Sequence, residues 1–305
     1  MSRAFQLGSE SATDGRFQRQ RSRFRDQVTD PEPGRYHLYV SWACPWAHRT
    51  VIVRRLKGLE DVIGMSVVDP VRDDRGWAFT GGEFVDDVNG FRLLSEAYDA
   101  TDPRFEGRYS VPVLWDTVAG RIVNNESSDI VRMLDTVFDP LATTDVELAP
   151  AALRDEIDEL NEHLYETVNN AVYKAGFATR QGVYEEEVRT LFATLDDLDA
   201  RLADRRFLFG AEPLETDWRL FTTLVRFDPV YAIHFKCSLQ RITEYEHLWP
   251  YLRDLYQQPG IAETVDFEQI RAHYYGTHPS INPTGIVALQ PRADLSEPPG
   301  RDHLG

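Results

Sequence analysis

The chain of 305 residues is 42% hydrophobic, which suits two globular domains with ordinary cores. Its formal net charge of −17 argues against nucleic acid or an anionic membrane as a partner, because an acidic surface repels polyanions. No segment is as long and apolar as a membrane span or a secretory signal, so we expect a cytoplasmic protein.

The first elements predicted along the chain are a polar extension, a strand, a helix and a second strand. Residues 1–34 are polar and arginine-rich and are expected to form an N-terminal extension. The segment "RYHLYVSWA" (35–43) has the aromatic and β-branched residues of a strand, and "VIGMSVVDP" (62–70) is expected to be another. Between them, Pro45 suits the first turn of a helix. Cys44 therefore falls at a strand-to-helix junction.

The segment that follows is less regular. Residues 71–109 are rich in Gly and Asp and predict an irregular insertion that contains a short helix. The segments "SVPVLWD" and "IVNN", separated by the turn "TVAGR", predict a hairpin. Residues 126–138 predict a helix whose acidic start suits its dipole, and residues 139–150 are typical of a linker.

After residue 150 the sequence is helical almost throughout. Apolar residues recur at spacings of three and four, the pattern of amphipathic helices, at Leu153, Ile157, Leu160, Leu164, Val168, Val188, Leu191, Leu195, Leu198 and Leu202. We therefore expect an extension (1–34), an α/β domain (35–140), a helical domain (150–288) and a C-terminal tail (289–305).

The position of Cys44 favours a reactive thiol over a small buried filler. Unpaired N–H groups and the helix dipole at a helix start stabilise a thiolate. The fourth position of a C-x-x-C pair is Ala47, so no resolving cysteine lies one turn along. A lone thiolate of this kind forms a mixed disulfide that an external thiol resolves. Cys237 lies in an apolar segment that we expect to be helical, and we expect its thiol to be buried and inert.

Two further motifs point to a ligand. The first motif is "SVPVLWD", in which Val111 precedes a proline at the start of a strand. A β-bulge or an edge strand would explain the same pattern without a ligand. Glu126 and Ser127 begin the helix after the hairpin, where backbone N–H groups and a hydroxyl suit a ligand carboxylate and Glu126 suits an α-amino group. Plain helix capping would explain the same two residues.

Long motifs along the chain are similar to those of one enzyme family. They are "SWACPWAHRT", "GWAF", "GRYSVPVLWD", "IVNNESSDIVRML", "NNAVYKAGFA", "RLFTTLVRFDPVY" and "HYYGTHPSINPTGIV", in this order. Over residues 35–288 the sequence resembles the glutathionyl-hydroquinone reductases, also called Xi-class glutathione transferases. The resemblance implies an α/β plus all-α fold, with a thioredoxin-like N-terminal domain followed by an all-helical C-terminal glutathione-transferase domain.

The resemblance implies a site for a thiol cosubstrate. It implies that Cys44 is the catalytic nucleophile and that Trp77 packs against the cosubstrate. Val111 would pair with the cosubstrate through its backbone, beside a cis Val–Pro bond, and Glu126 and Ser127 would hold its γ-glutamyl end. The cosubstrate is expected to be glutathione or another low-molecular-weight thiol, such as γ-glutamylcysteine or mycothiol.

The resemblance also implies catalytic roles for Tyr173 and Tyr274, with Tyr275 as an alternative neighbour. Their hydroxyls would donate to the phenolic oxygens of the substrate and stabilise the leaving hydroquinone. The implied reaction reduces an S-glutathionyl-hydroquinone through a Cys44 mixed disulfide, which a second glutathione resolves. It requires no metal and no bound cofactor. The resemblance also implies a homodimer.

Two other functions compete with this one. A general thiol transferase, similar to dehydroascorbate reductases, shares the Cys–Pro turn but lacks the pair Tyr173 and Tyr274. The protein could instead be a non-catalytic transferase fold that serves as an interaction module. In such a protein the nucleophile would not be needed and could be replaced during evolution. The presence of Cys44, Glu126 and Ser127 favours an enzyme.

Overall fold

The computed structural model describes residues 12–304, which divide into two compact units. The first, here called the sheet unit, consists of Gln20–Val146 and Glu268–Thr277. The second, the helical unit, consists of Glu147–Phe267 with residues 12–19 and 278–304. Residues 1–11 of the expected extension, and residue 305, lie outside the described residues. No helix within 12–304 is long and apolar enough to cross a membrane.

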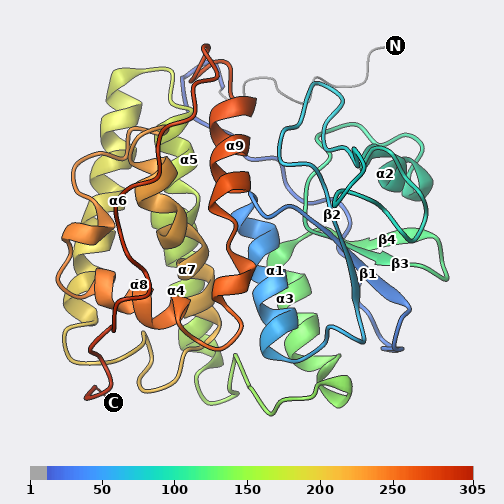
Figure 1. The fold of residues 1–305 in the computed structure, drawn as a ribbon, viewed down its shortest axis with the longest axis horizontal. Helices are drawn as coiled ribbons and strands as arrows, with labels where there is room; N and C mark the ends of the chain where they lie inside the picture. Colours follow the sequence, from blue (N-terminus) through green and yellow to red (C-terminus); the bar gives the residue numbers. More distant parts are fainter. Residues whose placement is uncertain (1–11, 305) are drawn as a thin grey trace. The chain divides into compact units, whose positions relative to one another are not determined.

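The sheet unit is built on four strands in the order β2-β1-β3-β4 (Figure 1). The strand β1 (Tyr36–Val40) runs parallel to β2 (Gly64–Val67) and antiparallel to β3 (Val113–Asp116). The strand β3 pairs antiparallel with β4 (Arg121–Asn124). The predicted strand–helix–strand unit and the predicted hairpin are therefore confirmed, and together they make a small thioredoxin-like sheet.

Two helices of the sheet unit pack together, and Figure 1 shows them side by side next to the sheet. The helix α1 (Pro45–Leu56) begins with a proline, which needs no N–H partner in a first turn, and two arginines in its last turn suit the helix dipole. The helix α3 (Ser127–Thr136) turns an apolar face inward that includes Ile130 and Leu134. Each helix starts shortly after a strand of the sheet: α1 follows β1, and α3 follows β4.

The insertion over 71–109 contains the short helix α2 (Ser95–Thr101) and is otherwise irregular, as predicted. Its anchor is the buried carboxylate of Asp86, which accepts hydrogen bonds from the Tyr39 hydroxyl (3.1 Å) and from the backbone N–H of Phe91 (2.9 Å). Because Tyr39 belongs to the central strand β1, these bonds fix the insertion to the sheet.

The helical unit consists of amphipathic helices. They are α4 (Arg154–Leu164), α5 (Ala171–Gly176), α6 (Gln181–Arg201), α7 (Glu215–Arg226) and α8 (Leu248–Tyr256), with single π-helical turns at η2 (Tyr165–Asn169) and η3 (Phe227–Tyr231). Short 3-10 turns of the same unit lie at η4 (Ile242–Glu244) and η5 (Ala262–Thr264). The 3-10 turn η1 (Asp139–Leu141) and all but the first residue of the last helix, α9 (Phe267–Thr277), belong to the sheet unit. Of the ten apolar residues that recur at spacings of three and four in the sequence, all but Leu153 and Leu160 are buried. The spacing therefore identified residues of the core.

The segment around Cys237 corrects one expectation. It is not helical: the chain leaves η3 and turns, with Lys236 in the left-handed region at a φ of 60°. The Cys237 side chain is nevertheless fully buried, and burial raises the pKa of its thiol far above the usual range. The prediction of an inert thiol fits this burial, although the helix that was its premise is absent.

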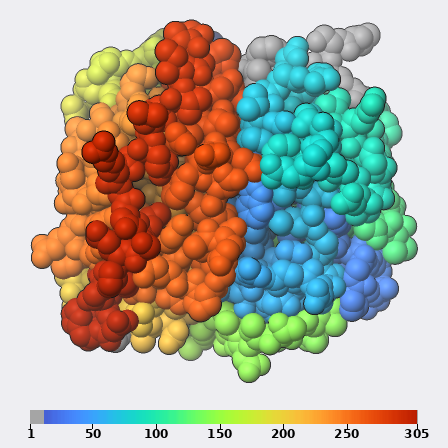
Figure 2. Space-filling model, in the orientation of Figure 1, coloured from blue at the N-terminus to red at the C-terminus, as the bar shows by residue number. Residues whose placement is uncertain are grey.

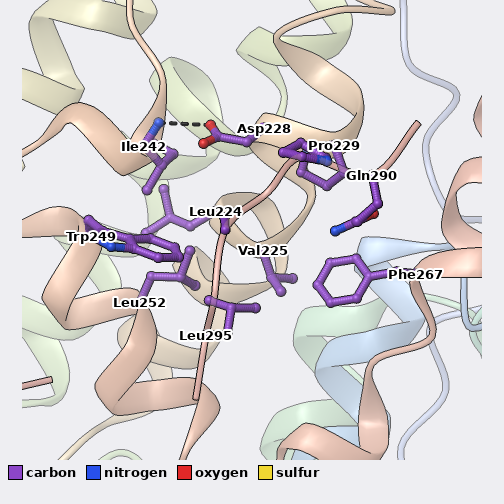
Figure 3. A pocket seen from close by; sticks show the side chains of 12 residues that line it. Leu224, Val225, Asp228, Pro229, Ile242, Trp249, Leu252, Phe267, Gln290 and Leu295 are labelled. Carbon is purple, nitrogen blue, oxygen red and sulfur yellow. Dashed lines mark hydrogen bonds between the residues drawn. The ribbon is translucent and has the colours of Figure 1, made fainter. Parts of the chain in front are cut away.

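The C-terminal segment runs along the surface of the helical unit, where Figure 2 shows it in red. Its anchor is the buried Arg301 side chain, which donates to the carbonyl oxygens of Leu202 (2.9 Å) and Arg205 (2.6 Å). Earlier in the segment, Gln290 and Leu295 are among the residues that line an apolar pocket (Figure 3). None of the residues expected to carry chemistry lines this pocket.

Candidate active site around Cys44

Cys44 is the N-cap residue of α1 and is partly exposed. Its backbone is extended, at φ −81° and ψ 118°, and its carbonyl already accepts the first helical bond from the N–H of His48 (2.9 Å). The thiol itself lies at the positive end of the helix dipole. A group in this position is well placed to be stabilised as an anion, as the sequence predicts.

A carbonyl group faces the Cys44 thiol from the neighbouring loop. The Sγ atom lies 3.5 Å from the backbone oxygen of Val111, and the thiol donates to it. The Val111–Pro112 peptide bond is cis, as expected for a thioredoxin-like site. The loop that precedes β3 therefore brings backbone polar groups to the thiol, which is where a peptide-like ligand would find them.

A buried tyrosine that the sequence analysis did not identify holds this loop in place. The Tyr98 hydroxyl of α2 donates to the backbone oxygen of Ser110 (2.8 Å) and accepts from its N–H (3.0 Å). The same hydroxyl accepts from the side-chain amide of Asn125 (3.1 Å). Burial raises the pKa of this phenol, so it stays neutral and can both donate and accept. Tyr98 thus connects the cis-proline loop to the residue directly before Glu126.

Glu126 and Ser127 lie at the start of α3, and the capping interpretation is realised in part. Glu126 is the N-cap residue, and its Oε1 atom accepts from the backbone N–H of Ser128 (3.3 Å). Its Oε2 atom accepts from the hydroxyl of Ser22 (2.9 Å), a residue of the segment that precedes β1. Ser127 follows in the first turn and is buried. Capping leaves open a further role for Glu126, because its carboxylate has room for more than one donor.

The segment that carries Ser22 also pairs with the edge of the sheet. The backbone N–H of Phe24 donates to the side chain of Asn125 (3.0 Å), and the N–H of Asp26 donates to the carbonyl of Val123 (3.1 Å). The composition of residues 1–34 gave no signal for this pairing, because its partners, Val123 and Asn125, lie about 100 positions further along the chain.

Trp77 lies in the insertion and is buried in contact with two other side chains. Its ring stacks on the imidazole of His273, with centroids 4.9 Å apart and planes at 19°. The guanidinium of Arg72 lies 5.3 Å from the centre of the same indole ring. The Nδ1 atom of His273 lies 2.7 Å from the backbone oxygen of Pro70, so the imidazole is itself held.

Tyr274 and Tyr275 follow His273 on α9 and are also buried. The sheet unit therefore contains six of the seven expected site residues, namely Cys44, Trp77, Val111, Glu126, Ser127 and Tyr274. Tyr173, the seventh, belongs to α5 of the helical unit, where its ring packs against those of Phe235 (5.3 Å between centroids) and Tyr231 (6.0 Å).

The chemistry available to Cys44 follows from these neighbours. Neither cysteine of the described residues is in a disulfide bond, and Cys237 is buried in the helical unit. A partly exposed thiolate can attack a substrate sulfur, and because the thiol of Cys237 is buried, the resulting mixed disulfide then needs an external thiol. Within residues 12–304 no group of His, Cys, Asp and Glu side chains is arranged to hold a metal ion.

Comparison with protein families gives two matches. The model of the glutathione S-transferase N-terminal domain matches residues 43–137, and the model of the C-terminal domain matches residues 181–256. The first match begins one residue before Cys44 and includes Trp77, Val111, Glu126 and Ser127.

Similar proteins agree with these matches. The glutathionyl-hydroquinone reductase YqjG of Escherichia coli (strain K12) is 50% identical over 307 residues, which covers 95% of this chain and 94% of that protein. The solved structure of a Xi class GST from Natrialba magadii is 52% identical, with a TM-score of 0.90 over 92% of this chain and 89% of that one. The glutathione-bound structure of YqjG is 50% identical, with a TM-score of 0.89 over 92% of this chain and 96% of that one.

Proposed function

The chain belongs to the glutathione transferase family, and within it to the Xi-class glutathionyl-hydroquinone reductases, and we propose that it reduces S-glutathionyl-hydroquinones to hydroquinones with glutathione as the reductant. The observation that carries the proposal is the partly exposed Cys44 thiol at the start of α1, 3.5 Å from the carbonyl before the cis proline. A conventional transferase needs only to activate the thiol of glutathione, whereas a protein nucleophile in this place can form a disulfide itself.

The reaction that we propose has two displacement steps. The Cys44 thiolate attacks the sulfur of the conjugate, the bond between sulfur and the aromatic carbon breaks, and that carbon takes the electron pair and then a proton. The products are the hydroquinone and a mixed disulfide of Cys44 with glutathione. The thiolate of a second glutathione then attacks the mixed disulfide, which yields oxidised glutathione and regenerates the Cys44 thiolate.

The thiol site that we propose lies in the sheet unit. Val111 offers its backbone groups, Glu126 accepts the α-amino group, and the start of α3 with Ser127 accepts the α-carboxylate of a γ-glutamyl group. Trp77 forms a wall of the site. The proposal is supported by the placement of these residues in the same compact unit as Cys44, and by the glutathione-bound structure of YqjG, which is 50% identical.

The leaving group requires help, because an aromatic carbanion is a poor leaving group unless its charge is delocalised onto ring oxygens. We assign this help to the hydroxyls of Tyr173 and Tyr274, each donating to a phenolic oxygen of the substrate. The assignment rests on the family resemblance of the motifs "NNAVYKAGFA" and "HYYGTHPSINPTGIV". It distinguishes the reductase from a general thiol transferase, which has no phenolic oxygen to bind.

We also propose that the enzyme works in the cytoplasm as a homodimer, with small-molecule thiols and quinone conjugates as its only partners. The net charge of −17 supports the exclusion of nucleic acid and anionic membranes. Size-exclusion chromatography with light scattering tests the dimer: a mass twice the 35.0 kDa of the chain is expected.

The reductase itself is tested with an S-glutathionyl-hydroquinone and excess glutathione. Hydroquinone and oxidised glutathione are followed separately, and the wild-type protein is expected to release them in equal amounts. Cys44→Ala is expected to release neither, and Cys237→Ala, which changes the buried thiol of the helical unit, is expected to keep the activity. Release of neither product by the wild type, with glutathione, γ-glutamylcysteine or mycothiol and their matching conjugates, contradicts the proposal. Activity with small disulfides alone then favours a general thiol transferase.

A further inference from the structure

Residues 12–19 are fixed on the helical unit, to which they belong. The carbonyl of Gly15 accepts from the backbone N–H of Thr179 (3.1 Å), and the Arg16 guanidinium pairs with the carboxylate of Glu186 (2.7 Å). Phe17 is buried and stacks on Phe177, with ring centroids 5.5 Å apart. The segment is therefore a packed part of the unit that carries Tyr173.

Arg19, near the end of this segment, lies over the ring of Tyr173. Its guanidinium carbon is 4.6 Å from the ring centroid, which is within the range of a cation–π interaction. Its Nε atom donates to the side-chain oxygen of Asn170 (2.8 Å). The carbonyl of Asn170 in turn accepts from the backbone N–H of Tyr173 (3.0 Å). The guanidinium of Arg19 and the backbone of Tyr173 are thus both bonded to Asn170, the residue directly before α5.

A cation in this place changes what the Tyr173 hydroxyl can do. A positive charge over the face of a phenol favours the electron density that builds up when the O–H bond polarises, so the hydroxyl becomes a better hydrogen-bond donor. The leaving hydroquinone needs such donors as negative charge develops on its oxygens. The same contact also adds to the packing of Tyr231 and Phe235 against the ring, which limits its movement.

We propose that Arg19 is a positioning residue for the reductase, which holds the Tyr173 ring in place and strengthens its hydroxyl as a donor to the phenolic oxygen of the substrate. The catalytic part of this inference rests on the proposed function. The interaction between Arg19 and Tyr173 does not, and it is tested separately.

The matched control is Arg16, an arginine of the same segment that pairs with Glu186 and Glu187 on α6. Arg16→Gln removes a charge and two ion pairs that hold the segment, whereas Arg19→Gln removes the cation over Tyr173. Arg19→Lys keeps the charge and loses the planar guanidinium. Far-UV circular dichroism and thermal unfolding of the three variants show whether each one is folded.

The first measurement is an alkaline titration of phenolate absorbance, with the Tyr173→Phe protein subtracted so that the difference reports Tyr173. In Arg19→Gln the midpoint of this transition is expected to move to higher pH than in the wild type. In Arg16→Gln it is expected to stay unchanged, and Arg19→Lys is expected to lie between. Equal midpoints in Arg19→Gln and the wild type overturn the inference, whatever the activity of the protein.

The second measurement is a double-mutant cycle on the turnover of an S-glutathionyl-hydroquinone. Arg19→Gln is expected to lower kcat about three- to tenfold in the wild-type background, with the KM for glutathione changed less than about twofold. In the Tyr173→Phe background the same substitution is expected to have almost no effect on kcat. An equal loss of kcat in both backgrounds contradicts the proposed route through Tyr173. If the wild type has no reductase activity, the proposed function fails, and the titration still decides whether Arg19 acts on Tyr173.

Discussion

The hydroxyl of Ser22 donates to the carboxylate of Glu126 at 2.9 Å, across 104 positions of sequence. The same hydroxyl lies 3.0 Å from the carbonyl oxygen of Asn125, so it contacts both residues that lead into α3. The stretch ahead of the first strand therefore completes the start of the helix at which we place the γ-glutamyl group. It does so by orienting the carboxylate that is expected to accept the amino group of the thiol.

Replacing Ser22 by Ala removes the donor to Oε2 of Glu126, so that among the described residues the carboxylate is held only through its Oε1 atom by the N–H and hydroxyl of Ser128. We expect the KM for glutathione to rise about two- to tenfold, the effect of one hydrogen bond, with kcat for the conjugate nearly unchanged. Steady-state kinetics with varied glutathione measure both constants. Gln20→Ala is a suitable control, because Gln20 lies in the same segment and bonds to Arg108 instead. An equal effect of the two substitutions would show that the segment acts only through its fold.

His273 provides the second prediction, since it stacks on Trp77 and is held by the carbonyl of Pro70. His273→Ala removes the ring on which the indole rests, and we expect the KM for glutathione to rise about three- to tenfold. His273→Phe keeps an aromatic ring and loses the bond to Pro70. Its KM for glutathione is therefore expected to lie between those of the wild type and His273→Ala. The quenching of tryptophan fluorescence by glutathione gives a binding constant independent of turnover. If both variants bind the thiol like the wild type, Trp77 is not part of its site.

The third prediction concerns stability in acid and the buried imidazole of His37, whose Nε2 atom lies 2.8 Å from the Ser66 hydroxyl. Burial lowers the pKa of His37 to about 4, whereas a histidine in an unfolded chain has a pKa of about 6.5. The unfolded state therefore binds more protons between these values, and the free energy of unfolding falls as the pH falls from about 6.5 to about 4. The loss is about 2 kcal/mol between pH 7.5 and pH 5.

Urea unfolding of the wild type and of His37→Gln at pH 7.5 and pH 5 measures this loss. The variant is expected to lose less free energy of unfolding than the wild type over this interval. The difference between the two proteins isolates His37 from other titrating groups, namely His234, whose pKa burial also lowers to about 4, and Asp217, whose pKa burial raises to about 6. Identical pH dependence in the two proteins would contradict the assignment to His37.

Thiol labelling gives the fourth prediction. Cys44 is partly exposed and Cys237 is fully buried, with the pKa of its thiol raised by that burial. Titration of the native protein with an aromatic disulfide reagent is therefore expected to find one reactive thiol, and the denatured protein two. In Cys44→Ala the native protein is expected to show none. A reactive thiol in native Cys44→Ala would mean that Cys237 becomes accessible in solution.

Much of this architecture could be predicted because the decisive signals are local. Pro45 marks the start of α1, and the Val–Pro step and the turn after it mark the hairpin. The local patterns also suggested the roles of Cys44, Glu126 and Ser127, whereas the roles of Trp77, Tyr173 and Tyr274 came from the resemblance alone. Six of the seven candidates lie in the unit that carries the thiol, but their contact with substrate stays a prediction.

The remaining features depend on contacts between distant parts of the chain. Ser22 and Tyr98 form hydrogen bonds with backbone and side-chain groups that are distant in the sequence or across a loop. Neither residue stands out in the sequence by its type. The segment near Cys237 has helical spacing, yet Lys236 adopts a left-handed backbone and the chain turns there. Spacing alone does not record where tertiary packing requires a turn.

The stack of Trp77 on His273 can form only late in translation, because the two rings are far apart in the sequence. The two rings lie in one compact unit, but nearly all of the helical unit is translated between them. A nascent chain that has emerged as far as Val146 already contains the residues of the four strands and Cys44, and it still lacks the ring on which the indole rests. The wall of the thiol site that we propose is therefore completed only after α9 has left the ribosome.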